Sequence, residues 1–411
     1  MRSARRAAFV ALQHRNFRLL WMGQFVSFAG SQMQTAALLW HISLLVPPAW
    51  KALALGLVGL SRIGPILLLG LVSGVAADAV DRRRLMLGAQ VVMALTALAL
   101  AAVTATGLAT PWLLLLVAGL GAAAGVVDAP ARQALLPSLV PREHLPNAIS
   151  LNSIVRQAAS VIGPSLGGIV IATAGVTPVY ALNAVSFLGV IGALLAMRGL
   201  PPIEKAERGA LSVGALGEGI RFVFRAPLIR STMLLDGLAT FFSSATALLP
   251  IFAQDVLVVG PRGYGWLYAA PSVGAVLASL VLVPSADRIR HRGRVLVWAV
   301  TAYGAATIVF GLSRAFWLTF LALAATGASD TVSAVLRNIV RQLETPDRLR
   351  GRMVGVNMIF FIGGPQLGEF EAGVVAQWLG AATSVVLGGV ACLATTGWIA
   401  WRTPGLRAYR R

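Results

Sequence analysis

The sequence predicts an all-α polytopic membrane protein with about twelve transmembrane helices in two pseudo-symmetric six-helix halves. The 411 residues are 57% hydrophobic and only 12% charged, whereas a soluble protein of this size carries about 25% charged residues. Apolar runs of roughly 20 residues, the length of a membrane-spanning helix, recur along the whole chain. They do not alternate in segments of about ten residues, as the strands of a membrane β-barrel would.

The order of apolar and polar segments predicts six spans, a linker and six more spans. The first six spans cover residues 19–46, 54–77, 85–106, 112–129, 148–173 and 178–197. The second six cover 229–254, 264–284, 295–312, 316–335, 353–376 and 381–401. The predicted organisation is a first half at 1–199, a cytoplasmic linker at 200–228 and a second half at 229–411. Within the linker, 212–224 has the pattern of an amphipathic helix on the inner membrane surface.

The formal charge of +19 would also suit a nucleic-acid-binding protein. However, if the N-terminus is inside, all but four of the 34 Lys and Arg fall in cytoplasmic segments or at their membrane edges. The four exceptions are Lys51, Arg62, Arg262 and Arg314. This distribution follows the positive-inside rule for short loops. We therefore expect a multi-pass protein of the cell (inner) membrane, with both termini cytoplasmic and with no nucleic-acid partner.

Several kinds of chemistry lack a signature in the sequence. The single cysteine, Cys392, and the four histidines show no metal-ligand spacing. No phosphate-binding GxxxxGK[ST] loop occurs, so an ATPase site of that kind is not expected. No Ser/His/Asp cluster suggests a membrane enzyme. We therefore predict a non-enzyme without a metal or cofactor.

The two halves repeat one another at single residues. Gln24 follows Arg18 by six residues, as Asp236 follows Arg230. Asp128 is followed 36 residues later by Pro164, and Asp330 is followed 35 residues later by Pro365. Two six-span halves are the plan of many secondary transporters, whose substrate site lies between repeats near the membrane midplane.

Three groups of residues resemble motifs of the major facilitator superfamily. Its signature loop between spans two and three is matched by Gly74, Asp78, Asp81, Arg82 and Arg83. A degenerate second copy is formed by Asp287, Arg288, Arg292, Gly293 and Arg294. The motif of its exporters in span five is matched by Gly163, Pro164, Gly167 and Gly168. Residues 17–21, 136–141 and 366–373 are most similar to the enterobactin-exporter and macrolide-efflux group.

The resemblance implies the major facilitator fold and alternating access between the two halves. It also implies proton-driven export of a small amphipathic molecule such as a siderophore or an antibiotic. Two departures qualify the match: Ala79 replaces the usual basic residue after Asp78, and span four lacks the arginine of the drug–proton antiporters. A proton mechanism is therefore not carried over from that arginine. The loop residues are expected to control conformation, with Gly74 at a close helix contact and Asp78 at a helix N-terminus.

Charged residues inside predicted spans are the candidates for proton coupling or substrate contact. Such a charge costs about 2.5 kcal/mol or more and is usually functional. The candidates, with two polar residues of the presumed cavity, are Asp128, Asp236, Asp330, Glu369, Glu371, Arg62, Arg156, Gln24 and Asn357. Burial favours a neutral carboxyl and a neighbouring arginine favours a charged one, so this balance can tune a proton site.

Each candidate also has a structural interpretation. Asp128 and Asp330 fit helix-end salt bridges, and an Asp128–Arg156 pair would form an inner gate. Asp236 fits either a coupling site or a buried acid bonded to a neighbouring helix.

Other positions in the spans are equally open. Glu369 and Glu371 point to different helix faces, and we assign Glu369 to the cavity and Glu371 to a structural pairing. Arg62 fits attraction of an anionic substrate as well as snorkelling or pairing with a glutamate of span eleven. Gly163-Pro164 and Gly364-Pro365 fit simple helix kinks.

The sequence thus predicts a monomeric secondary transporter whose partners are a small-molecule substrate and the lipid bilayer. An importer or symporter of the same fold remains open, as does a non-transporting membrane sensor or scaffold. A sensor or scaffold usually adds a soluble domain, and the longest polar segment here is the central linker.

Overall fold

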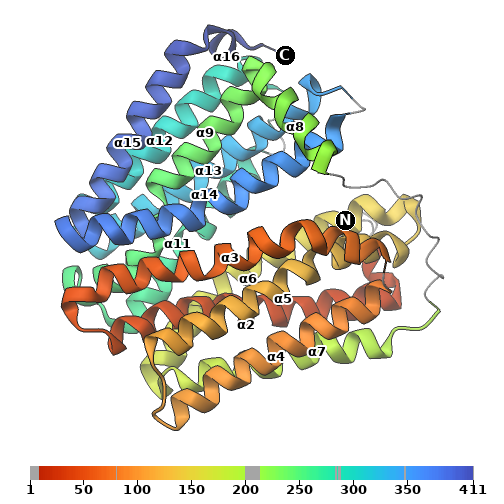
Figure 1. Cartoon of the computed structure of the whole chain (residues 1–411), viewed down its shortest axis with the longest axis vertical. Coiled ribbons are helices and arrows are strands. Elements are labelled where there is room, and N and C mark those ends of the chain that lie inside the picture. The colour runs from red at the N-terminus through yellow and green to blue at the C-terminus, as the bar shows by residue number, and fades with distance from the viewer. Residues whose placement is uncertain are drawn as a thin grey trace, which may run out of the picture. The chain divides into compact units, whose positions relative to one another are not determined.

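The computed structural model describes residues 9–79, 81–199, 213–282, 285, 288–346 and 349–410, and the elements formed by these residues are all helical (Figure 1). Twelve of the helices are long. They are α2 (Arg15–Leu45), α3 (Lys51–Ala79), α4 (Arg82–Ala105), α5 (Pro111–Leu135), α6 (Leu145–Ala174), α7 (Thr177–Ala196), α9 (Pro227–Ser243), α11 (Gly260–Leu282), α12 (Arg292–Leu312), α13 (Phe316–Glu344), α14 (Arg350–Leu379) and α15 (Ala381–Arg402). Nine spans within the described residues are long and apolar enough to cross a membrane. The predicted fold class is confirmed.

The chain divides into two compact units by its internal contacts. The first unit consists of Met1–His41 and Gly64–Gly209, and the second of Ile42–Ile63 and Ala210–Arg411. Both α2 and α3 therefore contribute to both units. The N-terminal part of α3 belongs to the second unit, where Gly56 packs against Gly373 of α14 and a methyl group on Gly56 would lie 2.9 Å from the Gly373 Cα. Such small residues allow membrane helices to approach closely.

In the first unit, α4 packs against α5 and α7, and α6 packs against α7. At one end its apolar core extends into the short helices η1 (Val10–Gln13) and η3 (Leu136–Ser138) and the neighbouring turns. This core includes Phe17, Leu20, Met86, Leu151 and Leu194. The helix η4 (Arg142–His144) leads into α6, and the His144 side chain forms a 2.8 Å hydrogen bond with His14.

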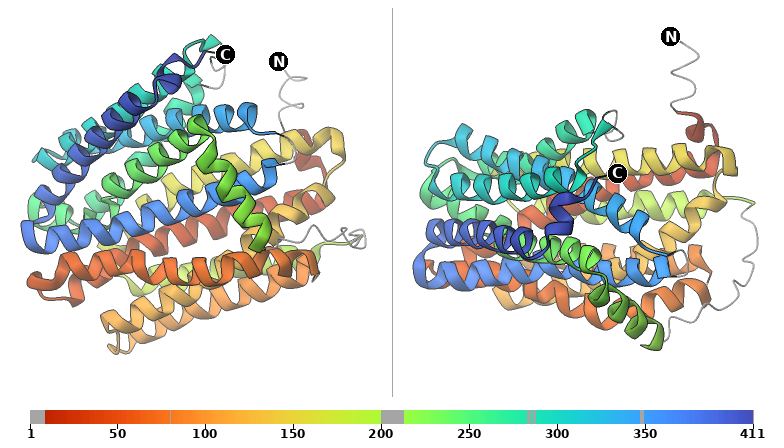
Figure 2. Two further views of the ribbon diagram at one scale, coloured as in Figure 1. Left: turned by 45° about the horizontal axis from the view of Figure 1, so that its top comes forward. Right: turned by 90° about the horizontal axis from the view of Figure 1, so that it is seen from above.

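In the second unit, α12 lies between α13 and α15, while α9 packs against α14 and α15. The core between them contains Leu235, Leu296, Val300, Leu336 and Ile399. A short amphipathic helix, α8 (Val213–Arg225), precedes α9 and contacts both α9 and α14 (Figure 2). Exposed Ile220 and Phe224 alternate on it with exposed Arg221 and Arg225. The pattern is that of an interfacial helix, as the sequence predicted.

Two spans differ from their predicted form. The span predicted at 229–254 is interrupted, because Ser244 leaves the helical region with ψ of 76°. The chain continues through η5 (Thr246–Leu248), α10 (Leu249–Ile251) and a π-helix (η6, Phe252–Val256). The span predicted at 316–335 instead continues to Glu344 as the end of α13. The sequence-based boundary stopped at the first basic residues, although the backbone remains helical beyond them.

Candidate functional site

A buried charge cluster in the second unit surrounds Asp236 of α9. One carboxylate oxygen lies 2.8 Å from Nη2 of Arg337, and the other lies 3.3 Å from Nη2 of Arg341. The three residues are only 2–4% exposed. The two guanidinium groups offset the cost of burying this carboxylate. Asp236 therefore ties α9 to α13, in agreement with the prediction of a buried acid bonded to a neighbouring helix.

Each arginine of the cluster has further partners that fix its position. Arg341 donates to the Thr232 carbonyl at 3.0 Å, to the Thr232 hydroxyl at 3.3 Å, and to Oδ1 of Asn357 on α14. Asn357, predicted as a polar residue of the site, thus links α14 to the cluster. The bonds of Arg341 connect three helices at one point.

Arg337 is shared between two carboxylates. Its Nη2 lies 3.5 Å from Asp330, and its Nη1 donates to the Ser333 hydroxyl at 2.6 Å. The Asp330 side chain is 44% exposed, while that of Asp236 is 2% exposed. The structure therefore brings two predicted acids together around one guanidinium group, one acid enclosed and the other accessible.

Neither arginine was predicted as a site residue. Arg337 and Arg341 lie beyond the predicted end of the span at residue 335, so they were counted as cytoplasmic charges. The available signal was the spacing of three, four and four residues between Asp330, Ser333, Arg337 and Arg341. Residues at i, i+3, i+7 and i+11 share one helix face, and Arg337 and Arg341 on this face contact Asp236.

In the first unit, Asp128 of α5 is buried in a smaller polar group. Its carboxylate accepts from Gln90 of α4 at 2.9 Å and lies 3.3 Å from Arg132. The Arg132 guanidinium also lies 4.5 Å from the ring centre of Phe28 on α2, a favourable cation–π distance.

The predicted Asp128–Arg156 pair is wrong. Arg132 follows Asp128 by one helical turn and so reaches it from the same helix. Arg156 of α6 is exposed, and its guanidinium donates to Ser153 at 3.4 Å. Gln24 of α2, the position equivalent to Asp236, is 4% exposed. No described residue accepts from the Gln24 side-chain amide nitrogen.

A third polar group lies at the broken span. Glu369 of α14 is 8% exposed and accepts from the Thr246 hydroxyl of η5 at 3.0 Å. Arg62 of α3 is near enough to act on Glu369 through its charge, but no ion pair joins these two described residues, so the predicted pairing stays a prediction. The second oxygen of Glu369 has no hydrogen-bond partner among the described residues. Glu371 is half-buried, and no ion pair joins it to another described residue. The role assigned to Glu371 in structural pairing stays a prediction.

The loop motif between α3 and α4 serves as a helix cap and a tether. Asp81 accepts from the backbone N–H groups of Arg83 and Arg84 at 2.9 and 3.1 Å, which makes it the N-cap of α4. Arg82 donates to the Ala134 carbonyl at 2.9 Å. Asp78 lies near the C-terminal end of α3. The surroundings of Gly74 and of the Asp78 side chain fall outside the described part of the structure, so the roles predicted for both residues stay predictions.

Arg83, the last residue of this motif, donates to the Leu195 carbonyl on α7 at 3.2 Å. The two arginines after Asp81 thus hold the start of α4 against α5 and α7.

The second copy of this loop starts α12. A methyl group on Gly293 would lie 1.7 Å from the carbonyl oxygen of Leu406 in α16 (Pro404–Ala408), so only glycine fits this contact. The N–H of Gly293 also donates to the Tyr409 carbonyl at 3.3 Å. Arg288 and Arg294 are exposed, and Arg292 is half-buried. Asp287 lies outside the described residues. The glycine therefore docks the C-terminal segment.

The glycines of the exporter-like motif form a helix contact. On α6, methyl groups on Gly163 and Gly167 would lie 2.5 Å from the Ala29 carbonyl oxygen and 2.9 Å from the Met33 side chain of α2. Pro164 and Gly168 are buried beside them. Small residues four apart are a known close-packing pattern of membrane helices. The motif is therefore a packing surface as well as a potential kink.

The second unit repeats this contact between α14 and α9. A methyl group on Gly364 would lie 2.7 Å from the Thr240 hydroxyl, and one on Gly368 would lie 2.2 Å from the Phe241 carbonyl oxygen. Each unit thus packs its fifth helix on its first helix through two glycines four residues apart.

Comparison with known proteins agrees with this geometry. A family model described as transmembrane secretion effector matches residues 6–407. The enterobactin exporter EntS of Escherichia coli O1:K1 is 30% identical over 349 residues, which cover 84% of this chain and 81% of that protein. EntS of Citrobacter koseri is 31% identical over 349 residues, with the same shares.

Solved structures with similar folds are membrane transporters. A bacterial homologue of the human lysosomal transporter Spinster, in its inward-facing and unoccupied conformation, has a TM-score of 0.75 at 15% identity and covers 97% of this chain and 98% of its own. A variant of the nucleoside transporter NupG has a TM-score of 0.74 at 13% identity, with 93% and 99% covered. At these identities the likeness establishes the fold alone.

Proposed function

Because the chain belongs to the transmembrane secretion effector family of the major facilitator superfamily, we propose that it exports a small amphipathic molecule in exchange for protons. It is a multi-pass membrane protein, and its homology to enterobactin exporters supports an exporter. A siderophore is therefore the first substrate class to test, and an antibiotic is the second. The family is one of transporters, which argues against an enzyme.

The observation that carries the proton-exchange proposal is the unequal environment of two acids around Arg337. Asp236 is enclosed by two arginines at 2.8 and 3.3 Å, whereas Asp330 has one arginine at 3.5 Å and is 44% exposed. Each carboxylate oxygen of Asp236 is thus occupied by an ion pair. Asp330 is accessible and weakly paired, so it is the carboxyl that exchanges a proton.

Exchange requires that the proton and the substrate compete. An ionised Asp330 accepts hydrogen bonds from substrate hydroxyl groups, and a protonated Asp330 loses acceptor capacity. Substrate and proton then bind to the same carboxyl in turn. Asp236 positions Arg337 through its ion pair, and Arg341 positions Asp236 through its own bonds to Thr232 and Asn357.

The test uses everted membrane vesicles with a dye sensitive to the transmembrane pH difference. Siderophores and antibiotics are added one at a time, and transport of a labelled compound is followed in parallel. We expect substrate-triggered proton movement in the wild type, its loss in Asp330→Asn, and its retention in Asp255→Asn. Asp255 is a matched control because this exposed acid pairs with Lys51 away from the cluster.

The outcomes separate the parts of the proposal. Proton movement that survives in Asp330→Asn would refute the role of this acid, and Asp236→Asn would then be compared. Labelled substrate that crosses without any proton movement would refute proton exchange. Net uptake into whole cells would indicate an importer. Failure of any compound to cross would favour a sensor or scaffold.

The proposed setting follows from the same evidence. The enterobactin exporters of bacteria and the predicted charge distribution support the inner membrane with both termini cytoplasmic. The proposed partners are a small-molecule substrate and the lipid bilayer, with no nucleic acid, and the proposed oligomeric state is a monomer.

A further inference from the structure

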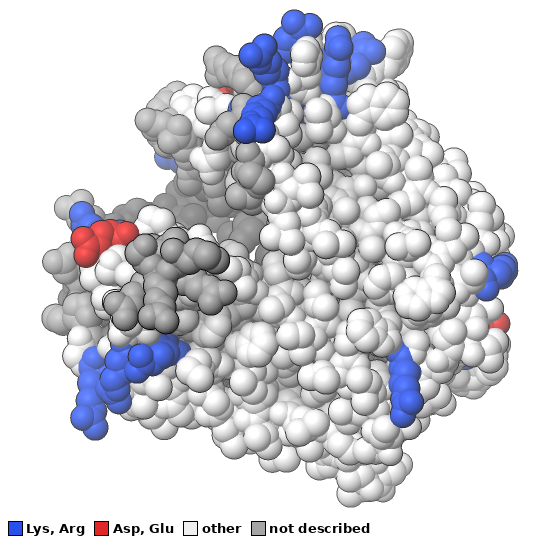
Figure 3. Space-filling view, turned by 180° about the vertical axis from the view of Figure 1, so that it is seen from behind, with Lys and Arg blue, Asp and Glu red and all other residues white. Residues whose placement is uncertain are grey.

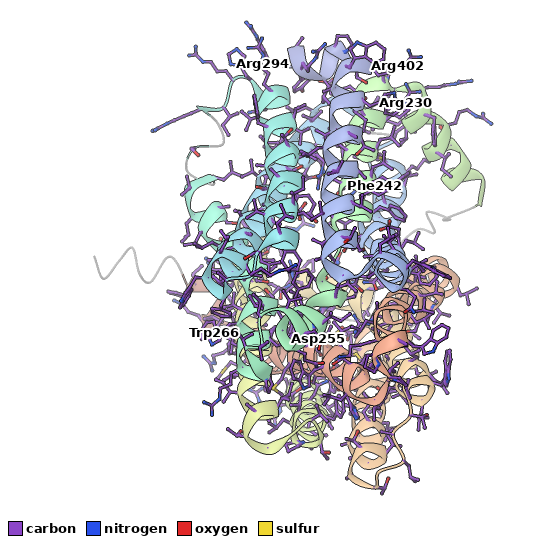
Figure 4. The ribbon with its side chains drawn as sticks, turned by 90° about the vertical axis from the view of Figure 1, so that its left-hand side faces the viewer. Arg230, Phe242, Asp255, Trp266, Arg294 and Arg402 are labelled. Atoms are coloured by element: carbon purple, nitrogen blue, oxygen red, sulfur yellow. The ribbon has the colours of Figure 1, made fainter. Side chains whose placement is uncertain are left out.

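One end of the second unit has a pocket that the transport site does not use. Pro227, Leu228 and Arg230 from the start of α9 line one side, and Arg402, Thr403 and Pro404 from the junction of α15 and α16 line the other. Its volume is about 380 Å³. Figure 4 shows Arg230 and Arg402 close together at this end, with Arg294 nearby, while Asp255 and Trp266 lie at the opposite end of the unit.

The pocket lies where two membrane spans end. Pro227–Val256 and Ala381–Arg402 are both long and apolar enough to cross a bilayer. Arg230 lies in the first turn of its span and Arg402 is the last residue of the other. Trp398 and Trp401 on α15 are 53% and 69% exposed, and tryptophan marks the headgroup level. The pocket therefore opens at the depth of lipid headgroups.

The charges around the pocket are uncompensated among the described residues. No acidic side chain lines it, and no ion pair joins Arg230 or Arg402 to a described acid. Arg230 donates a long hydrogen bond of 3.4 Å to the Phe224 carbonyl. The N-cap of α9 is Ala226, which provides no capping side chain, so the positive end of the helix dipole adds to the arginine field. Lys and Arg also gather at this end of the surface (Figure 3).

At the equivalent position of the first unit, a polar side chain bonds to the backbone. Asn16, two residues before Arg18, donates to the Arg198 carbonyl at 2.8 Å and accepts from the Arg198 N–H at 3.4 Å. In the repeat, Arg230 takes the position of Arg18 and makes the same contact, to a carbonyl six residues earlier at 3.4 Å. Leu228 then takes the position of Asn16. A leucine cannot form these bonds, and the second unit has the open pocket instead.

We propose that this pocket binds the phosphate of an anionic phospholipid. Arg230 and Arg402 contact the phosphate from two sides, and the acyl chains extend along the apolar surface of α9 and α15. Basic pockets between membrane helices bind headgroups in this way. The site depends on the described geometry of the second unit and not on the transported substrate.

The test measures binding of a fluorescent phosphatidylglycerol to the purified full chain in nanodiscs of phosphatidylcholine. The variants are Arg230→Gln/Arg402→Gln, Arg230→Lys/Arg402→Lys, and the control Arg407→Gln, which removes an exposed charge from α16 outside the pocket lining. An arginine near a charged lipid surface contributes about fivefold in affinity. We expect the double Gln variant to lose about 25-fold, the double Lys variant to keep part of the affinity, and the control to bind like the wild type.

Three results would overturn the proposal. The double Gln variant could bind phosphatidylglycerol as the wild type does, provided that its size-exclusion profile shows a folded protein. The Arg407→Gln control could lose as much affinity as the double variant, which would indicate diffuse attraction to the basic end. Inorganic phosphate at millimolar concentration could displace the lipid fully, which would indicate a site for the free anion. Loss of transport with lipid binding intact would concern only the proposed function.

Discussion

A methyl group on Gly368 should force α14 away from α9. The added Cβ would lie 2.2 Å from the Phe241 carbonyl oxygen and 2.9 Å from the Thr240 carbonyl oxygen. Ordinary contacts of a Cβ begin at about 3.4 Å, so the helices must separate by about 1 Å or the backbone must distort. Overpacking of this kind costs about 1–3 kcal/mol. The same change contributes up to about 1 kcal/mol of helix propensity.

Gly397→Ala is the matched control. It lies in α15, where an added Cβ meets no atom within 4 Å. Both variants have the propensity gain, so the difference in their free energies of unfolding isolates the steric cost of about 1–3 kcal/mol. At about 2–4 °C per kcal/mol for a unit of some 200 residues, a 2 kcal/mol cost separates the two apparent Tm values by about 4–8 °C.

The assay is thermal denaturation in detergent, followed by fluorescence-detected size exclusion at a fixed heating time. Gly368→Ala should melt below the wild type, and Gly397→Ala should melt at or above it. Equal Tm shifts of the two variants in the same direction would refute the steric reasoning, because the close contact at Gly368 would then have no measurable cost.

Three further variants test the polar contacts. Asp81→Ala should destabilise the chain by about 1 kcal/mol, since it removes the N-cap of α4; a Tm equal to that of Asp81→Ser would contradict the capping role. Arg341→Met should lower stability by about 3 kcal/mol or more, because it leaves a buried charge at Asp236 with one partner fewer; denaturation that matches the wild type would contradict this. Asp255→Asn should change the free energy of unfolding by less than about 1 kcal/mol, because its ion pair with Lys51 is partly exposed. A shift of the Tm by many degrees would show that this ion pair stabilises the chain by more than that.

The fold was predictable because the bilayer restricts which backbone structures can span it. A backbone that crosses hydrocarbon must satisfy its own hydrogen bonds, so twenty-residue apolar runs imply helices. The repeat was also readable, since Arg18 and Arg230 make the same contact in the two units. The glycines of the fifth and eleventh spans were recognised, but their contacts were not, because spacing alone does not show which helix they meet.

The charge cluster was only half predictable. Asp236 and Asp330 stood out as acids in apolar runs, whereas Arg337 and Arg341 did not, because hydropathy ends a span at its first basic residues. The Asp128–Arg156 pair failed for a different reason. Asp128 and Arg156 were both predicted near the same membrane face, which suggested a contact. However, Arg132 lies one turn from Asp128 on the same helix and forms the ion pair instead. A partner one helical turn away on the same helix is favoured over one on another helix.

The interruption of the seventh span has a mechanical consequence. A continuous helix behaves as a stiff rod, so a tilt at one end displaces the other. Here Asp236 lies on the segment before Ser244, and Gln254 and Asp255 lie on the segment after it, where both bond to Lys51. A rearrangement of the charge cluster can therefore tilt the segment that contains Asp236, while the bonds to Lys51 hold the segment after Ser244 in place. Glu369 of α14 accepts a hydrogen bond from Thr246 at this interruption. This bond restrains how far the two segments can move relative to one another.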